Sequence, residues 1–392
     1  MFKKSLVAVA ALATFSAGAM AANVELYGVV DIGFTYTHTS HQEKGDKFEM
    51  SNNLYAGSRF GFRGTEDLGN DLTVGFILEN GFIPDTGAMA ANGDIFNRES
   101  QLYLKGSWGQ LGFGRVGAFS SGSSSLSWYW DLEPFETGYN DAGIQASQVN
   151  VWRLNSNTIY YISPVYAGFK FGAQYSLTGD ADPTRQEDPN WSDNNNFANV
   201  ALRWDGANAR GILGVEWDKY GDPESKLDGN GASRDDAWSV KLVGAWVPNG
   251  GPVTLYAGAS WYKNQTRFSD SAWTGKNEVK YDNSGKSLDG YSFFVGGKYT
   301  VGAANWLAMF QYLDGENKGA IDGAPEKDYK RYIASVGCHY YLSKRTTRSL
   351  PSRTVTGSLM RSKTTQAMEI RTIVSWLTSV SRTSSKKKLM FV

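Results

Sequence analysis

The amino-acid sequence predicts an all-β protein, and within that class a transmembrane antiparallel β-barrel. Residues 24–34 alternate, with Val, Leu, Gly, Val, Ile and Phe at even positions and mostly polar residues at odd positions. This is the period of a strand with one apolar face. The mean hydropathy is -0.39, and no apolar run of 18 residues follows the N-terminal segment, which excludes transmembrane helices. The chain also has 44 glycines, 14% aromatic residues and 10 prolines, which suits many strands joined by glycine turns.

The first 21 residues have the layout of a secretory signal peptide. Lys3 and Lys4 form a basic start, residues 6–15 form an apolar run, and residues 19–21 offer small side chains at the cleavage positions. The apolar run is too short to span a bilayer as a helix. We therefore expect the mature chain to begin at Ala22. It contains one cysteine, Cys338, so no internal disulfide is expected.

The alternating pattern recurs along the chain and predicts fourteen strands. Many of them exceed the five or six residues typical of soluble proteins, and a tilted strand needs about 9–11 residues to cross a membrane. The predicted strands, with ends placed to within a few residues, are 24–37, 54–66, 71–82, 97–107, 110–117, 153–163, 166–178, 196–206, 208–221, 235–247, 252–264, 287–299, 303–314 and 328–343.

The connections alternate between short and long. Tight turns fall at 67–70, 107–110, 163–166, 205–208 and 248–251. Polar loops fall at 38–53, 83–96, 118–152, 179–195, 222–234, 265–286 and 315–327. This order places all tight turns at one end of a meander and all long loops at the other, as in outer-membrane barrels. Aromatic residues gather near strand ends, where they suit both membrane interfaces. Lipid offers the backbone no hydrogen-bond partner, so the sheet is expected to close.

Four segments, in order along the chain, resemble the general porins of Gram-negative outer membranes, a family of trimeric sixteen-stranded barrels. They are residues 24–34, 58–69, 112–115 and 157–164, and with the intervening strands the resemblance covers nearly all of residues 22–345. It implies a water-filled channel for passive diffusion of small hydrophilic solutes and ions. It also implies that loop 118–152 folds back into the barrel, that the chain forms a homotrimer in outer-membrane lipid, and that no cofactor is needed.

The resemblance further implies a constriction where basic residues on the wall face acids on the infolded loop, so that a transverse field acts on solutes. Arg59 alternates with glycines onto the polar face of its strand, and Arg115 and Arg153 flank the long loop. Simple alternation would turn Arg115 outward, and a bulge at Gly114 would reverse this. Arg98 shares the parity of two leucines, which argues against a place in the pore. The acids available on the loop are Asp131, Glu133, Glu136 and Asp141.

Other interpretations of these residues stay open. Each loop acid is equally well a solvated carboxylate. Trp128-Tyr129-Trp130 could stack sugars, although anchoring the loop against the wall is the favoured interpretation. His38, His41, Glu43 and Asp46 in the first loop could bind a metal or belong to a hydrolytic site, but their spacing matches no closed site and no nucleophile motif accompanies them.

No phosphate-binding loop or nucleic-acid signature occurs, so we expect a channel rather than an enzyme and no nucleic-acid partner. The alternatives are a channel selective for sugars or anions and, further off, a barrel enzyme or adhesin. Ion preference stays open: residues 22–343 contain 26 Lys and Arg against 38 Asp and Glu, which favours cations, whereas arginines at the narrowest point would favour anions.

The C-terminal segment differs from the rest of the chain. Residues 344–392 contain 11 Lys and Arg, one acid (Glu369) and one glycine (Gly357), and the alternation fades among Ser and Thr. The resembling family would have two more strands here, ending in an aromatic residue. We therefore expect residues from about Thr346 to be translated out of frame, with a genuine basic tail as the competing explanation. On this view residues 346–392 leave the edge of strand 24–37 unpaired, and the chain assembles poorly.

Overall fold

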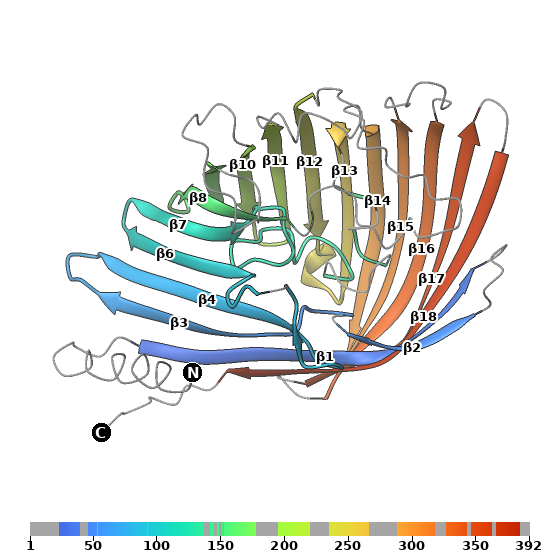
Figure 1. The fold of residues 1–392 in the computed structure, drawn as a ribbon, viewed down its shortest axis with the longest axis horizontal. Coiled ribbons are helices and arrows are strands. Elements are labelled where there is room, and N and C mark those ends of the chain that lie inside the picture. Colours follow the sequence, from blue (N-terminus) through green and yellow to red (C-terminus); the bar gives the residue numbers. More distant parts are fainter. Residues whose placement is uncertain are drawn as a thin grey trace.

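The regular elements that the computed structural model describes are antiparallel strands, apart from short 3-10 turns (Figure 1). The structure describes residues 23–39, 46–52, 54–91, 93–136, 142–144, 147–148, 151, 153–177, 195–219, 235–265, 288–317, 327–342, 346–362 and 366–384. The signal-peptide prediction therefore lies outside the described residues. None of the described helices is long and apolar enough to cross a membrane.

The strands of the first half are β1 (Asn23–Thr39), β2 (Lys47–Asn52), β3 (Arg59–Asp67), β4 (Thr73–Ile83), β5 (Ala88–Met89), β6 (Glu99–Gly106), β7 (Gly109–Gly117), β8 (Leu154–Ile162) and β9 (Phe169–Ser176). Those of the second half are β10 (Asn196–Asp205), β11 (Ala209–Lys219), β12 (Ala237–Trp246), β13 (Val253–Gln265), β14 (Leu288–Val301), β15 (Ala304–Asn317), β16 (Lys327–Tyr341), β17 (Thr346–Ser362) and β18 (Gln366–Ser384). A short 3-10 turn, η4 (Pro248–Gly250), joins β12 to β13.

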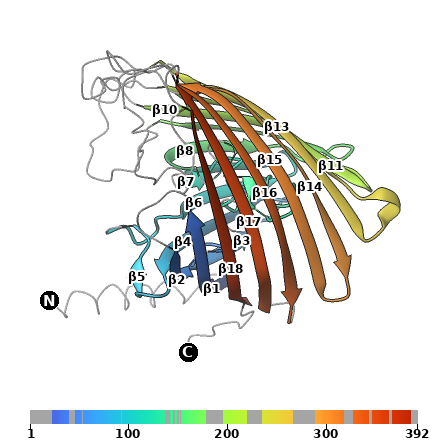
Figure 2. The same cartoon turned by 90° about the vertical axis from the view of Figure 1, so that its right-hand side faces the viewer.

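Antiparallel pairing closes the sheet into a ring. Consecutive long strands pair with each other from β3 round to β18, and β1 pairs with both β18 and β3. Within the described residues the ring has sixteen strands, and the short β2 and β5 add pairs to β1 and β4 beside it. Figure 2 shows β14 to β18 side by side. The predicted fold class, a closed antiparallel β-barrel, is confirmed.

The fourteen predicted strands all occur, with one clear difference in bounds: the strand expected from residue 54 begins at Arg59, because residues 54–58 turn inward. The expectation of an unpaired β1 edge was wrong. The C-terminal segment forms β17 and β18, and Tyr27 to Thr39 of β1 pair with β18. A ladder requires only backbone N–H and C=O groups, and the Thr, Val and Ile of this segment favour extended backbone.

The two faces of the sheet differ as the alternation requires. On β12, Lys241 is fully buried inside the barrel while its neighbour Leu242 is 62% exposed on the outer face. Exposed apolar side chains recur on the outer face of other strands, as at Val295 on β14, Phe310 on β15 and Val336 on β16. The buried apolar core lies instead inside the ring, because Phe119, Tyr129 and other residues of loop 118–152 fill it. We call residues 118–152 the inner loop.

Candidate functional site

The first turn of the inner loop is attached through Ser120 to an ion pair within the wall. Lys241 on β12 lies 2.9 Å from Glu216 on β11, and both side chains are buried. Ser120 of the loop bonds to Glu216, and the Lys241 ammonium donates to the Ser120 hydroxyl over 3.1 Å. Ser239 also donates to Glu216 over 2.8 Å. The loop thereby satisfies a buried charge pair that would otherwise be costly.

The end of the loop is attached beside this pair. Arg153, predicted as a pore residue, forms an ion pair with Asp218 and lies 4.1 Å from the centre of the Phe197 ring. Asp218 lies two residues after Glu216 on β11, so both carboxylates point inward. Arg153 is buried, so the structure places it in the loop attachment and not on an open water surface.

The tip of the loop is attached through Asp131. Its carboxylate accepts from Arg203 on β10 at 2.8 Å and 2.9 Å and lies 2.7 Å from Arg210 on β11. Arg203 also bonds Asp205. Although partial burial would raise it, the bonds and charges of the two arginines hold the pKa of Asp131 below its usual value. Neither arginine was singled out from the sequence.

The other predicted loop acids have different surroundings. Glu133 is buried and accepts the backbone N–H of Phe135 over 2.8 Å, so it stabilises a turn of the loop. Glu136 accepts the Tyr55 hydroxyl. Asp141 lies outside the described residues.

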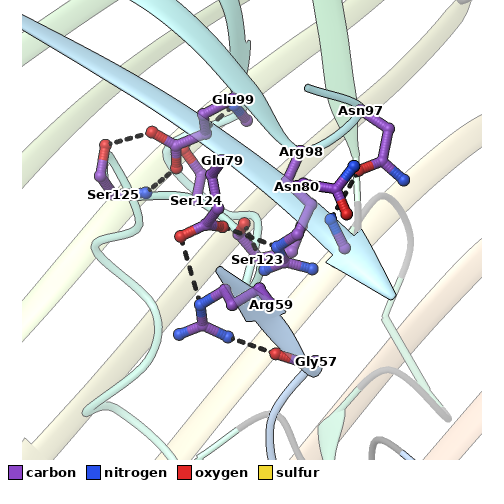
Figure 3. A network of polar contacts seen from close by, with 12 residues as sticks. Gly57, Arg59, Glu79, Asn80, Asn97, Arg98, Glu99, Ser123, Ser124 and Ser125 are labelled. Carbon is purple, nitrogen blue, oxygen red and sulfur yellow. Dashed lines mark hydrogen bonds and ion pairs between the residues drawn. The ribbon is translucent and has the colours of Figure 1, made fainter. Parts of the chain in front are cut away.

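A cluster of arginines and glutamates lies on the opposite wall (Figure 3). Glu79 on β4 lies 3.2 Å from Arg59 on β3 and 2.6 Å from Arg98, so two cations share one acid. Arg98 also donates to the Ser123 carbonyl of the inner loop over 2.9 Å. Glu99 accepts the Ser125 hydroxyl over 2.7 Å. We call Arg59, Glu79, Arg98 and Glu99 the arginine–glutamate cluster.

A cavity of about 560 Å³ lies between this cluster and the inner loop. The wall contributes the cluster together with Tyr27 and Arg63, and the loop contributes residues 122–125, Ser127 and Trp130. The Arg63 side chain is 51% exposed and is paired with Glu25 at 2.7 Å, whereas the side chains of Arg59 and Glu79 are 20% and 8% exposed. The residues that line the cavity include three arginines and two glutamates.

Arg98 and Arg115 have different partners in the structure. Parity argued against Arg98, but β6 begins only at Glu99, so the strand period does not apply to Arg98. Arg115 bonds the Asn97 carbonyl and the Ser156 hydroxyl, each over 2.7 Å. Gly114 has φ +124, and the pairing of β7 with β8 shifts register after it, as a bulge would. These two hydrogen bonds of Arg115 thus go to residues outside the inner loop.

The remaining sequence candidates have structural contacts. Trp128 stacks on Phe119 at 4.5 Å, and the buried Tyr129 donates to Gln148 over 2.8 Å, so both act within the loop attachment. His38 lies 2.5 Å from Asp46, which also bonds Tyr36 across the β1–β2 hairpin. His41 and Glu43 lie outside the described residues, and the described residues contain no group of three potential metal ligands.

Comparisons with known proteins agree with this architecture. A family model described as Gram-negative porin matches residues 8–349. An outer membrane porin protein of Bordetella pertussis is 32% identical over 88% of this chain and 92% of its own length. Outer membrane porin protein 32 of Delftia acidovorans is 35% identical over 45% of this chain and 50% of its own length. The solved structure of an anion-selective porin from Comamonas acidovorans superposes with a TM-score of 0.66 at 20% identity, covering 93% of this chain and all of that one, which supports the fold.

Proposed function

Because the chain belongs to the Gram-negative porin family and is an outer-membrane channel for small hydrophilic solutes and ions, we propose that the gap between the arginine–glutamate cluster and the inner loop is its selecting point. The observation that carries the proposal is the cavity that remains between the loop and this part of the wall, where Ser123 and Ser125 of the loop bond Arg98 and Glu99. Asp131, Ser120 and Arg153 fasten it to β10, β11 and β12, and Ser147 donates to Gln311 on β15 over 2.7 Å. The cavity is left on the opposite side, beside β1, β3, β4 and β6.

The charges at this gap favour anions over cations there. Arg59 and Arg98 share Glu79, and Glu99 is buried against the Ser125 hydroxyl and the Gln101 amide. Opposed charges across a narrow aqueous pore filter ions by sign. The acid excess of the whole chain acts at longer range, where salt screens it. We therefore favour the anion-selective alternative over a channel without ion preference.

The test is the reversal potential of the full chain across a planar bilayer in a KCl gradient. We expect a potential of the sign for chloride preference, and Arg59→Ser should shift it toward potassium. Arg115→Ser is the matched control, because it also removes an arginine but one that is not among the residues lining the cavity. A potassium preference in the unaltered chain, or equal shifts in the two variants, would contradict the proposal.

The proposal extends to assembly and chemistry. We infer a homotrimer in outer-membrane lipid, no nucleic-acid partner and no enzymatic activity. In the described residues the bonds of His38 and Asp46 join two strands of one hairpin, which supports a structural role for that pair. Trimer formation is tested by heat-sensitive mobility in a gel. Hydrolysis of ester or peptide substrates that is lost in His38→Ala would contradict the absence of catalysis.

We also propose that residues from about Thr346 are read in a displaced frame. The family model stops matching at residue 349, close to the point where the composition changes. Codons beginning at the third base of each present codon can read His-Phe-Phe-stop across Arg382 to Lys386, given C ending the Arg382 codon, T ending the next three, and codons beginning with TC for Ser384 and Ser385. A porin-like chain ending in an aromatic residue is therefore compatible with the same DNA.

A further inference from the structure

Residues 54–58 leave the sheet between β2 and β3 and turn into the barrel, held by one carboxylate. Asp31 on β1 is fully buried and accepts the backbone N–H groups of Leu54, Tyr55 and Ala56 over 3.2, 2.7 and 2.7 Å. Ser58 adds bonds to the Asp31 backbone at 2.9 and 3.2 Å. Successive N–H groups converging on an anion form a preorganised nest, and such charge-assisted bonds are stronger than neutral ones.

This segment presents Tyr55 to the inner loop. The Tyr55 ring lies edge-on to Trp130 at 5.9 Å and to His339 of β16 at 5.0 Å, and its hydroxyl donates to Glu136. Trp130 and Glu136 belong to the inner loop, whereas Asp31 and His339 belong to the wall. Tyr55 therefore bridges the wall at β1 and β16 to the loop, on the side where the loop attachments to β10, β11 and β12 do not reach.

The bridge lies at one end of the proposed selecting gap. Trp130, which Tyr55 contacts, lines the cavity, and so does Arg59, four residues after Tyr55. Resting on the proposed function of that gap, we propose that Tyr55 closes its end and sets its width, so that Tyr55 determines the solute size limit and Asp31 is its positioning residue. Pore diameter decides which hydrated solutes pass, so this position acts on size, whereas Arg59 acts on ion sign.

The experiment measures single-channel conductance of the full chain and the largest neutral sugar admitted in a liposome-swelling assay. Tyr55→Ala should raise conductance roughly 1.5-fold and admit larger sugars, because the pore widens. Tyr55→Phe keeps the ring and should stay near the unaltered chain. Tyr55→Leu, which is apolar but shorter, should fall between the two and serves if the alanine variant does not fold.

Asp31→Asn tests the positioning role. An amide accepts fewer N–H bonds than a carboxylate and brings its own donors to the nest, so the segment should loosen and conductance should rise. Combined with Tyr55→Ala, it should add nothing further, since both changes remove one bridge. A merely structural Asp31 would lower folding yield without changing conductance or sugar size.

The matched control is Tyr262→Ala, which removes another buried inward tyrosine whose hydroxyl donates to the Asp314 carbonyl over 3.0 Å. An equal rise in this control would overturn the inference, because it would show general loosening. Unchanged conductance and sugar size in Tyr55→Ala, with a shifted reversal potential in Arg59→Ser, would overturn the inference alone. No response in either variant would overturn the proposed function as well.

Discussion

The two C-terminal strands, β17 and β18, join the ladder like β1 to β16, which we call the body strands, but only the sequence of the body strands carries the pattern of a membrane wall. On β12, buried Lys241 and exposed Leu242 alternate across the sheet. The sequence of residues 346–384 instead contains five arginines among many Ser and Thr residues, and its alternation of apolar and polar residues fades. Backbone pairing therefore tolerates many sequences, whereas a lipid-facing surface does not.

The largest effect should come from replacing the C-terminal segment by the chain that the displaced frame encodes from about residue 346. The replacement should restore alternating strands, and a basic position facing lipid costs about 2–4 kcal/mol at the membrane midplane. We expect the present chain to give little heat-resistant trimer after refolding in detergent and the replaced chain to give much more.

The coding DNA provides the first check, because the displaced frame must stay open and end in an aromatic codon. A frame that remains rich in Ser, Thr and Lys would rule out the explanation. So would a full yield of heat-resistant trimer from the present chain, which would mean that a ladder suffices for closure in lipid.

The body also contains buried charges, and these are tolerated because each has a partner. Lys241→Met leaves Glu216 buried beside Ser120 and Ser239 without its cation, and breaking such a pair costs about 3–5 kcal/mol. We expect a clear fall in the free energy of unfolding in urea. The double variant Lys241→Met with Glu216→Gln removes both charges and should recover most of the loss; equal losses in the single and double variants would contradict the account.

Features that depend on neighbouring residues could be predicted from the sequence, whereas features that depend on contacts distant in sequence could not. The body strands were predictable because alternation is local, as over residues 24–34. The inward turn at residues 54–58 was missed because it depends on Asp31, a residue far away in sequence. Arg98 was misjudged because strand parity was applied beyond the start of β6. The partners of Asp131 were missed because inward parity shows which side chains face the lumen but not which of them the loop reaches.

A basic residue introduced on the outer face of a body strand tests the same comparison. Leu242→Arg puts a charge at a strongly exposed outer position and should lower the free energy of unfolding in lipid vesicles by about 2–4 kcal/mol. Leu242→Ala is the matched control and should cost clearly less, since it adds no charge to the lipid face. A loss no greater than that of the control would mean that this face does not meet lipid.

The smallest expected effect is a dependence of channel behaviour on pH. It should arise in the body, where Asp131 holds the loop tip, because the C-terminal segment contains only one acid. The pKa of Asp131 lies below its usual value, so the ionised form is favoured in the folded state. Its contribution is complete above about pH 4, the ordinary range of an aspartate, and is lost as pH falls further through the folded pKa. Because this carboxylate is 41% exposed, the effect on global stability should be slight.

We therefore expect open-channel current noise to rise as the pH falls below about 4 and the loop tip loosens. Asp131→Asn should show raised noise already at neutral pH and lose that dependence, whereas Arg115→Ser should keep it. A variant Asp131→Asn that still responds to acid like the unaltered chain would place the titrating contact elsewhere.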